Sequence, residues 1–445
     1  MNEEKRRFYK QMWAFALPIT IQLMITSGLN IIDSVMVGSL GVEAIAAVGI
    51  SNKFTQFLAV ILQGFASGAT IFSSQYWGQR NVSGVKQILI LVSKIATIFS
   101  FIFALVTLLF TPFILGIFSD DVLVIAEAVP FLRIISLSYV FTALSMIFSV
   151  TLKTIGEVKR PTFYSVITLL TNTLFNWLLI FGPFGLPAFG IRGAAVATLL
   201  ARFVQTLLLF SLFVKKGILK PEVDSTEPAL QITGPYWKVT FPSIINHLTW
   251  TMGELVFFWL YTRTGTDQTA AISLIDPLVF LFICVFTGLS DASSVMIGNQ
   301  LGGKVYKKAL FYAKQFIRLT TILSIVISGV ILLFSPIILQ FYNITNHVEE
   351  LVNQVLLAYI VLLPFKNLNY VNNVGILRVG GDTTFVMWLD TLSVWLWGIP
   401  MAFLAVYLGW PLWSIFFVAN SHELIRAIIG VRRTLREGWL KTLIA

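Results

Sequence analysis

The sequence predicts an all-α integral membrane protein, in which twelve transmembrane helices form two pseudo-symmetric lobes of six helices each. The first observation is composition: 57% of the 445 residues are hydrophobic and only 12% are charged, against about 25% charged residues in a soluble domain. The second is that apolar stretches of roughly 20 residues, the length that crosses the hydrocarbon core of a bilayer, recur along the whole chain. The third is an internal repeat.

The predicted spans follow one another in two sets of six. The first set covers residues 14–38, 46–72, 90–118, 125–150, 163–183 and 193–214, and the second set covers 240–262, 269–298, 315–342, 351–375, 384–408 and 411–430. Between the sets lies the most polar stretch of the chain. We therefore expect an N-terminal lobe over 1–220, a cytoplasmic linker over 221–238 and a C-terminal lobe over 239–445.

The two halves repeat in a nearly constant register. One shift aligns Pro18 with Pro242, and the same shift aligns the segment 108–118 with the similar segment 332–342. Because each half has an even number of spans, the copies share one orientation in the membrane, as in transporters that rock two halves around a central binding cavity. The two early prolines are candidate hinges. A duplicated helix bundle without transport is the alternative.

Basic residues gather on one side of the predicted topology. The segments on that side contain Lys5, Arg6, Arg7, Lys10, Arg80, Lys86, Lys153, Lys159, Arg160, Lys215, Lys216, Lys220, Lys304, Lys307, Lys308, Arg378, Arg432, Arg433, Arg436 and Lys441. By the positive-inside rule both termini face the cytoplasm, and we expect a multi-pass protein of the cytoplasmic membrane. The net charge of +10 is therefore read as a topology signal, and we expect no nucleic-acid partner.

One carboxylate stands inside the first span. Asp33 shares a helical face with Gln22, Thr26 and Asn30, which precede it at steps of four, four and three residues. Lipid cannot satisfy such a polar stripe, so we expect this face to meet other helices or a wet cavity. A charge inside a bilayer costs several kcal/mol or more, so an intramembrane carboxylate predicts a functional site.

The fifth span carries a matching stripe. Ser165, Thr168, Asn172 and Asn176 follow one another at spacings of three and four residues. Taken singly, such residues can simply form hydrogen bonds that hold helices together. If they face Asp33, they are candidate hydrogen-bond donors to its ionised form.

The second half carries more charge, yet it has Phe257 at the position that aligns with Asp33. Glu423 and Arg426, at i and i+3, are expected to form an ion pair. Lys366 lies in the middle of a span and needs a nearby anion. The candidates for a substrate cavity are Met36 of the first half and, in the second, Asn246, Glu254, Asp276, Lys366, Asn369, Tyr370 and Asn373.

The motifs of soluble enzymes do not occur in the sequence. There is no Walker lysine in a glycine-rich loop, no H-E-x-x-H and no G-x-S-x-G. The segment RVGGDTT at 378–384 has two glycines but not the phosphate-loop pattern. We therefore expect a protein that is not an enzyme, that holds no metal or other cofactor, and that draws on an ion gradient.

Several segments resemble the multidrug and toxic compound extrusion (MATE) family, in particular its DinF-like branch. They are NIIDSVMVGSLG from residue 30, GATIFSSQYWGQRN from residue 68, FGIRGAAVATLLAR from residue 189 and GILRVGGDTTF from residue 375. The resemblance extends over essentially the whole chain. It implies two six-helix lobes in a V shape, with an export pathway for varied drugs between them that is driven by protons or sodium.

The resemblance also implies roles for individual residues. The coupling carboxylate of the family is an aspartate of the first span, which Asp33 matches. With Asn30 of the same stripe, the matching polar network consists of Tyr139, Asn172, Asn176 and Thr198. Some relatives have a second aspartate where this chain has Asn176, so Asp33 is the only carboxylate within the membrane in the N-terminal lobe.

The choice of ion follows from the same comparison. Sodium-coupled relatives use a glutamate in span 7 and an aspartate in span 10. This chain has Glu254 in span 7, but its span 10 offers Lys366, Tyr370 and asparagines and no carboxylate. This difference favours proton coupling, with sodium as the alternative.

The prediction is therefore a secondary active multidrug exporter, in which protons and lipophilic, often cationic compounds exchange by alternating access and Asp33 binds the proton. Its expected partners are small organic substrates and the lipid bilayer, and we expect a monomer. The alternatives are a sodium-coupled drug antiporter, a lipid-linked saccharide flippase, an ion channel and a membrane enzyme. A flippase would need an arginine-lined cavity for a pyrophosphate, and a channel would need a selectivity filter.

Overall fold

The computed structural model describes residues 3–185, 187–218, 230–340 and 344–444, and in these ranges every regular element is a helix. Contacts divide the chain into two compact units. We call Ile21–Tyr236 the first unit, and Met1–Thr20 together with Trp237–Ala445 the second unit. Each unit is described by itself.

The two units follow the predicted halves except at their first helices. Helix α1 (Glu3–Gly38) is divided after Thr20, and helix α8 (Leu230–Thr262) is divided after Tyr236. The opening segment of each half thus packs within the unit formed by the other half, which differs from the expected lobes 1–220 and 239–445. The predicted linker 221–238 lies outside the described residues up to position 229, and its remainder forms the first turns of α8.

Specific contacts explain why the opening segments change sides. In the second unit, the Phe8 ring packs 5.0 Å from that of Phe316, and Tyr312 donates a hydrogen bond to Gln11 at 3.2 Å. In the first unit, the Tyr236 hydroxyl donates to the backbone oxygen of Phe65 at 3.2 Å. Large aromatic side chains bury the most apolar area, so they fix which unit each segment joins.

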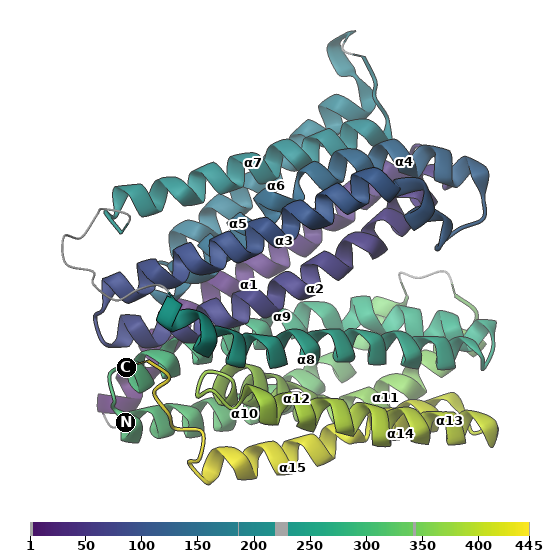
Figure 1. The fold of residues 1–445 in the computed structure, drawn as a ribbon. Coiled ribbons are helices and arrows are strands. Elements are labelled where there is room, and N and C mark those ends of the chain that lie inside the picture. The colour runs from purple at the N-terminus through teal and green to yellow at the C-terminus, as the bar shows by residue number, and fades with distance from the viewer. Residues whose placement is uncertain (1–2, 186, 219–229, 341–343, 445) are drawn as a thin grey trace. The chain divides into compact units, whose positions relative to one another are not determined.

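The first unit continues with α2 to α7 (Figure 1). Their bounds are α2 Val42–Gly78, α3 Val82–Gly116, α4 Val122–Leu137, α5 Tyr139–Thr154, α6 Lys159–Phe181 and α7 Ile191–Lys215. A short 3₁₀ turn, Pro183–Gly185, follows α6. Five of the six predicted spans correspond to one helix each, of which α3 is kinked at Phe110, and the fourth is broken in two.

The break in the fourth span lies at Ser138, where α4 and α5 meet at a bend of 44°. The hydroxyl of Ser138 donates to the Ile135 carbonyl at 2.6 Å, and the hydroxyl of Ser136 donates to the Arg133 carbonyl at 2.7 Å. Serine hydroxyls that bond back to the preceding turn bend helices. A second helix therefore begins at Tyr139 and runs in a different direction. The prediction of one continuous helix over 125–150 was wrong in this respect.

The second unit contains α8 from Trp237 onward and α9 to α15. Their bounds are α9 Thr266–Gly302, α10 Tyr306–Leu339, α11 Asn346–Asn369, α12 Thr383–Leu392, α13 Ile399–Tyr407, α14 Leu412–Asn420 and α15 His422–Leu435. Two π-helical segments, η2 (Tyr370–Leu377) and η3 (Ser393–Gly398), interrupt the tenth and eleventh spans. Such wide turns are rare and occur frequently at functional sites.

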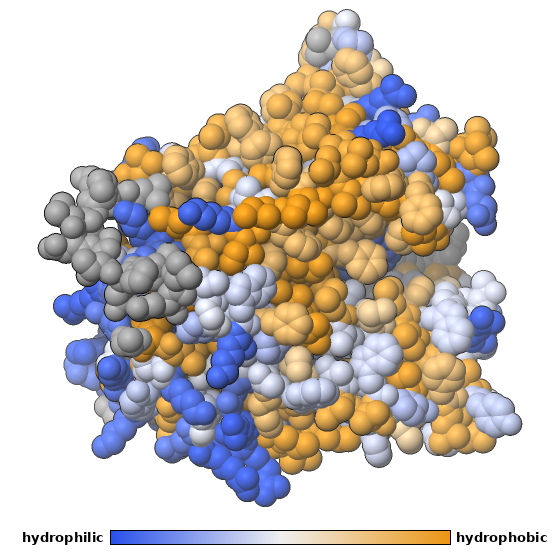
Figure 2. All heavy atoms as spheres, viewed as in Figure 1, coloured by the Kyte–Doolittle hydropathy of each residue, from blue (hydrophilic) through white to orange (hydrophobic). Residues whose placement is uncertain are grey.

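The length and surface of these helices confirm the twelve-helix membrane architecture. Within the described residues, ten helices are long and apolar enough to cross a membrane, and the bent pair of the fourth span adds an eleventh. Helix α8, with 33 residues, is the remaining predicted span. Figure 2 shows hydrophobic side chains gathered over α3, where Ile98, Phe101, Ile102, Leu105, Leu109 and Phe113 are exposed. An apolar exposed face of this kind is what lipid requires.

The RVGGDTT segment has a structural explanation in the second unit. Trp439 of the C-terminal tail is fully buried against Gly380, and a Cβ atom on Gly380 would overlap the Trp439 backbone oxygen. Gly381 adopts a φ of +87°, which favours glycine. Beside the two glycines, Arg433 donates to both carboxylate oxygens of Asp382, at 2.7 and 3.3 Å. The glycines thus let the tail close over the end of the tenth span.

We predict that Gly380→Ala destabilises the protein by about 1–3 kcal/mol, because the added methyl group overpacks the contact with Trp439. The measurement is the thermal unfolding midpoint, Tm, of the purified protein. Gly329→Ala is the matched control: Gly329 lies inside α10 with nothing within 4 Å of its position for a Cβ, so its replacement should leave Tm unchanged or raise it. Equal effects of the two substitutions would contradict the proposed role of the tail contact.

Candidate functional site

Asp33 lies half-buried on α1, and three side chains of α6 bond to its carboxylate. Thr173 donates to Oδ1 at 3.2 Å. With its amide nitrogen turned toward Asp33, Asn172 donates to Oδ2 at 3.0 Å while its oxygen accepts from the backbone N–H of Thr198 at 3.3 Å. Asn176 contributes a further side-chain hydrogen bond. The carboxylate thus has several donors, and all of them are neutral.

The polar stripes of α1 and α6 meet along their length. Near the start of both stripes, Thr162 donates to the side-chain oxygen of Gln22 at 3.2 Å. This pair and the Asp33–Thr173 pair are each separated by 140 residues in the sequence. The two helices therefore run parallel and in register, which is how the residues of two separate stripes come together.

A glycine sets the distance between α6 and the next helix. A Cβ atom on Gly193 of α7 would overlap the carbonyl group of Leu179 at the end of α6. The two helices can approach this closely only because Gly193 has no side chain. Thr198 follows five residues later on α7 and lies against Asn172, so the close approach brings Thr198 behind the Asp33 site.

The structure brings together four of the residues that the sequence proposed for this site: Asp33, Asn172, Asn176 and Thr198. Sequence reasoning missed Thr173, because it lies one position away from the fifth-span stripe and only the rotation of α6 turns it to Asp33. Asn30 is exposed on α1, and Met36 is half-buried on the same helix.

Tyr139 occupies a different place in the first unit. Its hydroxyl lies 3.0 Å from the hydroxyl of Thr55 on α2, and its ring packs 5.6 Å from Phe103 on α3. A further side-chain hydrogen bond joins it to Thr107. Among the described hydrogen bonds, none joins Tyr139 to Asp33. The bend at Ser138 directs the side chain toward α2 and α3.

The second unit contains a buried carboxylate that is bonded to an arginine. Asp390 on α12 is only 4% exposed and accepts hydrogen bonds from three elements. Asn246 on α8 donates to Oδ2 at 3.0 Å, Asn373 in η2 donates to Oδ1 at 3.2 Å, and Arg426 on α15 approaches Oδ1 at 2.8 Å. Unlike Asp33, this carboxylate is therefore bonded by a charged side chain, the Arg426 guanidinium.

Arg426 also binds a second carboxylate, that of Glu423, at 2.8 Å. The predicted ion pair is therefore confirmed, although it is shared with Asp390. Asn369 donates to the same Glu423 oxygen at 2.7 Å. The side chains of Arg378 and His247 lie 3.2 Å apart, and Arg378 also donates to Asn246. Because all these charges are buried, they depend on one another for compensation.

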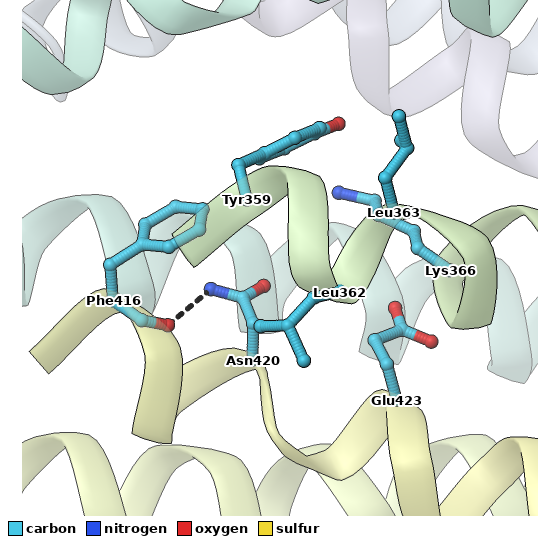
Figure 3. A pocket seen from close by; sticks show the side chains of 7 residues that line it. All are labelled: Tyr359, Leu362, Leu363, Lys366, Phe416, Asn420 and Glu423. Carbon is cyan, nitrogen blue, oxygen red and sulfur yellow. Dashed lines mark hydrogen bonds between the residues drawn. The ribbon is translucent and has the colours of Figure 1, made fainter. Parts of the chain in front are cut away.

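The remaining sequence candidates are spread over the second unit. Lys366 on α11 lines a small crevice beside Glu423 (Figure 3). Glu254 is exposed on α8, and Tyr370 is 39% exposed in η2. Asp276 belongs to α9, and its side chain lies outside the described residues. Both candidate hinges, Pro18 and Pro242, lie inside continuous helices.

Comparisons with known proteins agree with this architecture. A family model described as MatE matches residues 18–178 and again residues 242–404. The double match reproduces the internal repeat. Two relatives of known sequence cover most of the chain. The "uncharacterized transporter YisQ" of Bacillus subtilis is 24% identical over 97% of this chain and 95% of its own. The "probable multidrug resistance protein NorM" of Thermotoga maritima is 24% identical over 91% of this chain and 87% of its own.

The fold has a close counterpart among solved structures. The Vibrio cholerae MATE transporter VcmN in its bent form aligns with a TM-score of 0.89, at 19% sequence identity, over 99% of this chain and all of that chain. At this level of identity the match describes the fold alone. The twelve-helix arrangement therefore has an experimental precedent.

We predict that Arg426→Met destabilises the protein by about 3–5 kcal/mol, because it leaves two buried carboxylates without their shared cation. The loss should appear as a lower Tm and a smaller yield of monodisperse protein. Arg432→Met is the matched control, since Arg432 is exposed on the same helix and surface charges contribute little to stability. An Arg426 variant as stable as this control would mean that the ion network carries no stability.

Proposed function

Because the chain belongs to the MatE family, we propose that it is a secondary active multidrug exporter. It exchanges lipophilic, often cationic compounds for protons by alternating access, and Asp33 binds the coupling proton. The relative from Thermotoga maritima that carries the words "multidrug resistance" in its name supports the drug-export part of the proposal. The protein acts in the cytoplasmic membrane, as a monomer, with both termini in the cytoplasm.

The observation that carries the proposal is the neutral shell around Asp33. Its described hydrogen-bond partners Thr173, Asn172 and Asn176 bear no charge. Neutral donors support an ionised carboxylate without adding a counter-charge that protonation would leave unpaired. Asp33 can therefore gain and lose a proton without leaving an unpaired charge behind.

The amide of Asn176 provides for the protonated state as well. Its side-chain oxygen is buried without a hydrogen-bond partner. A protonated carboxyl group is itself a donor and needs an acceptor. If the amide turns, its oxygen accepts the Asp33 hydroxyl. The Asn176 amide can thus donate to the ionised carboxylate and accept from the protonated one. An ionised aspartate at this position could only accept, and it would add a second negative charge.

Protonation of Asp33 changes the affinity for the substrate through a conformational change of α1. The proton neutralises Asp33, and α1 bends or repacks around Pro18, where the proline ring removes the hydrogen bond to the Ala14 carbonyl. The helix passes from one unit to the other after Thr20, two residues beyond this proline. Coupling requires only that the proton and the drug favour different conformations.

The second unit supports protons over sodium as the coupling ion. Its tenth span presents Lys366 and asparagines, and its buried carboxylates Asp390 and Glu423 already bind Arg426. A sodium-coupled antiporter and a lipid-linked saccharide flippase remain the competing functions. Exchange driven by a sodium gradient alone would establish the first, and transport of a pyrophosphate-linked sugar would establish the second.

We predict that Asp33→Asn abolishes proton-driven efflux, because an amide cannot bind and release the coupling proton. The measurement is the flux of a fluorescent organic cation in proteoliposomes, first under a pH gradient and then under a sodium gradient. Asp120→Asn, in an exposed loop of the same unit, is the control and should transport at the native rate. Full efflux by the Asp33 variant, incorporated at an equal level, would refute the mechanism.

We predict, second, that acidification weakens drug binding to the native protein. If the proton and the drug favour different conformations, each added proton lowers the population that binds the drug. The dissociation constant for the fluorescent cation should therefore rise as the pH falls. In Asp33→Asn the constant should stay flat over the same pH range. Asp33 would not be the coupling site if the dissociation constant of the native protein did not change with pH. The same conclusion would follow if the Asp33→Asn variant kept the native pH dependence.

A further inference from the structure

An arginine stands in the middle of the sixth span of the first unit. Arg202 belongs to α7 (Ile191–Lys215) and lies about 16–20 Å from the two ends of this helix at a rise of 1.5 Å per residue. From that depth its side chain is too short to bring the guanidinium to the membrane surface. Charged side chains within a membrane are costly and pair with other groups inside the protein. Arg202 therefore needs an anion in the protein interior.

Helical pitch places Arg202 on the side of α7 that faces the protein. The large exposed side chains in this part of the helix share the opposite face, and they are Leu200, Phe203, Leu207 and Phe210. Thr198 and Gln205, four residues before and three residues after Arg202, share its own face. Gln205 is buried, whereas Arg202 is half-buried. The arginine side chain thus points away from lipid and stays partly accessible.

The described hydrogen bonds of Arg202 lead only to neutral groups. Its Nη1 atom donates to the side-chain oxygen of Gln205 at 3.0 Å. The Gln205 amide nitrogen in turn donates to the hydroxyl of Ser165 on α6 at 3.3 Å. Among the residues that the structure describes, no carboxylate lies within ion-pair distance of Arg202, and no hydrogen bond involves its Nε or Nη2 atom. These residues therefore provide no counter-charge for the guanidinium.

The internal repeat shows which partner the equivalent arginine has. Arg202 aligns with Arg426 and, after one inserted residue, Ser165 aligns with Asp390. In the second unit, the Nε and Nη2 atoms of Arg426 lie 2.9 and 2.8 Å from one Asp390 oxygen. In the first unit, the aligned Ser165 reaches Arg202 only through Gln205. The edge of the guanidinium that binds a carboxylate in one repeat thus has none in the other.

The other side of the guanidinium has an oxygen partner in both repeats. Nη1 of Arg426 donates to Glu423 at 2.8 Å, and Nη1 of Arg202 donates to Gln205 at 3.0 Å. Gln205 therefore orients the Arg202 side chain by one nitrogen and leaves the Nε–Nη2 edge open. This edge presents two parallel N–H groups, whose spacing matches the two oxygens of a carboxylate.

We propose that Arg202 binds the carboxylate group of a transported compound through its Nε–Nη2 edge. The ligand takes the place that the Asp390 side chain has in the other repeat, and it supplies the counter-charge. A lipid phosphate does not reach this depth, because headgroups lie outside the hydrocarbon core. The substrates then include lipophilic compounds with an acidic group. The inference rests on the proposed export function, but its test measures binding without transport, so either can fail alone.

The test compares an aromatic carboxylate with its neutral amide. Sodium benzoate should raise the Tm of the purified full chain by about 2 °C in a saturable way, because a ligand that binds only the folded state stabilises it. Benzamide, in sodium chloride of equal ionic strength, should not raise Tm. Arg202→Gln should lose the benzoate response. Arg192→Gln, at an exposed arginine of the same helix, is the matched control and should respond like the native protein.

Two further variants keep a positive charge at position 202. Arg202→Lys lacks the planar pair of N–H groups and should need a higher benzoate concentration for the same rise in Tm. Ser165→Asp places a carboxylate at the position that aligns with Asp390, so it should occupy the open edge of Arg202 and abolish the response. If Arg202→Gln does not fold, these two variants decide the outcome.

Three results would overturn the proposal. The first is an equal Tm of the native protein in benzoate and in benzamide with sodium chloride. The second is a folded Arg202→Gln variant that keeps the benzoate response, or an Arg202→Lys variant that responds at the native concentration. The third is a folded Ser165→Asp variant that still responds as the native protein does, because the comparison of the two repeats would then be wrong.

Discussion

The structure depends on one constraint: a polar or charged group within the membrane must find its partner inside the protein, because lipid offers none. The two units meet this constraint in opposite ways. Asp33 accepts hydrogen bonds from neutral side chains of α6. Asp390 and Glu423 instead share one guanidinium, that of Arg426, at 2.8 Å each.

This division grew out of a duplicated sequence. At the repeat position of Asp33 the second unit has Phe257, whose ring is buried and stacks 5.8 Å from that of His422. The buried carboxylates Asp390 and Glu423 stand instead on α12 and α15, where Arg426 binds both. The two repeats therefore share a fold but differ in their buried polar side chains. The fold requires apolar surfaces toward lipid, and it does not determine which polar residues lie inside.

The opening segments of α1 and α8 pack apart from the rest of their helices. Each segment is packed by aromatic side chains into the unit of the opposite half, and the division of each helix falls within a few residues of a proline. The two ends of each of these helices therefore pack in different units.

Residue periodicity and composition were sufficient to predict the twelve spans, the repeat and the polar faces of α1 and α6, because a helix of known pitch fixes which residues share a face. They also identified Asp33, Asn172 and Asn176, whereas Thr198 was predicted only from the family resemblance. Periodicity could not find Thr173, which depends on how α6 is rotated in the packed unit, or the direction of Tyr139, which depends on the bend at Ser138. It could not assemble Asn246, Asn373 and Arg426 around Asp390 either, since the wide turns of η2 shift the helical phase. Sequence by itself determined which side chains are polar within the membrane. Only the tertiary structure decided which of them meet, because the rotation, bending and contact distance of helices are properties of packing.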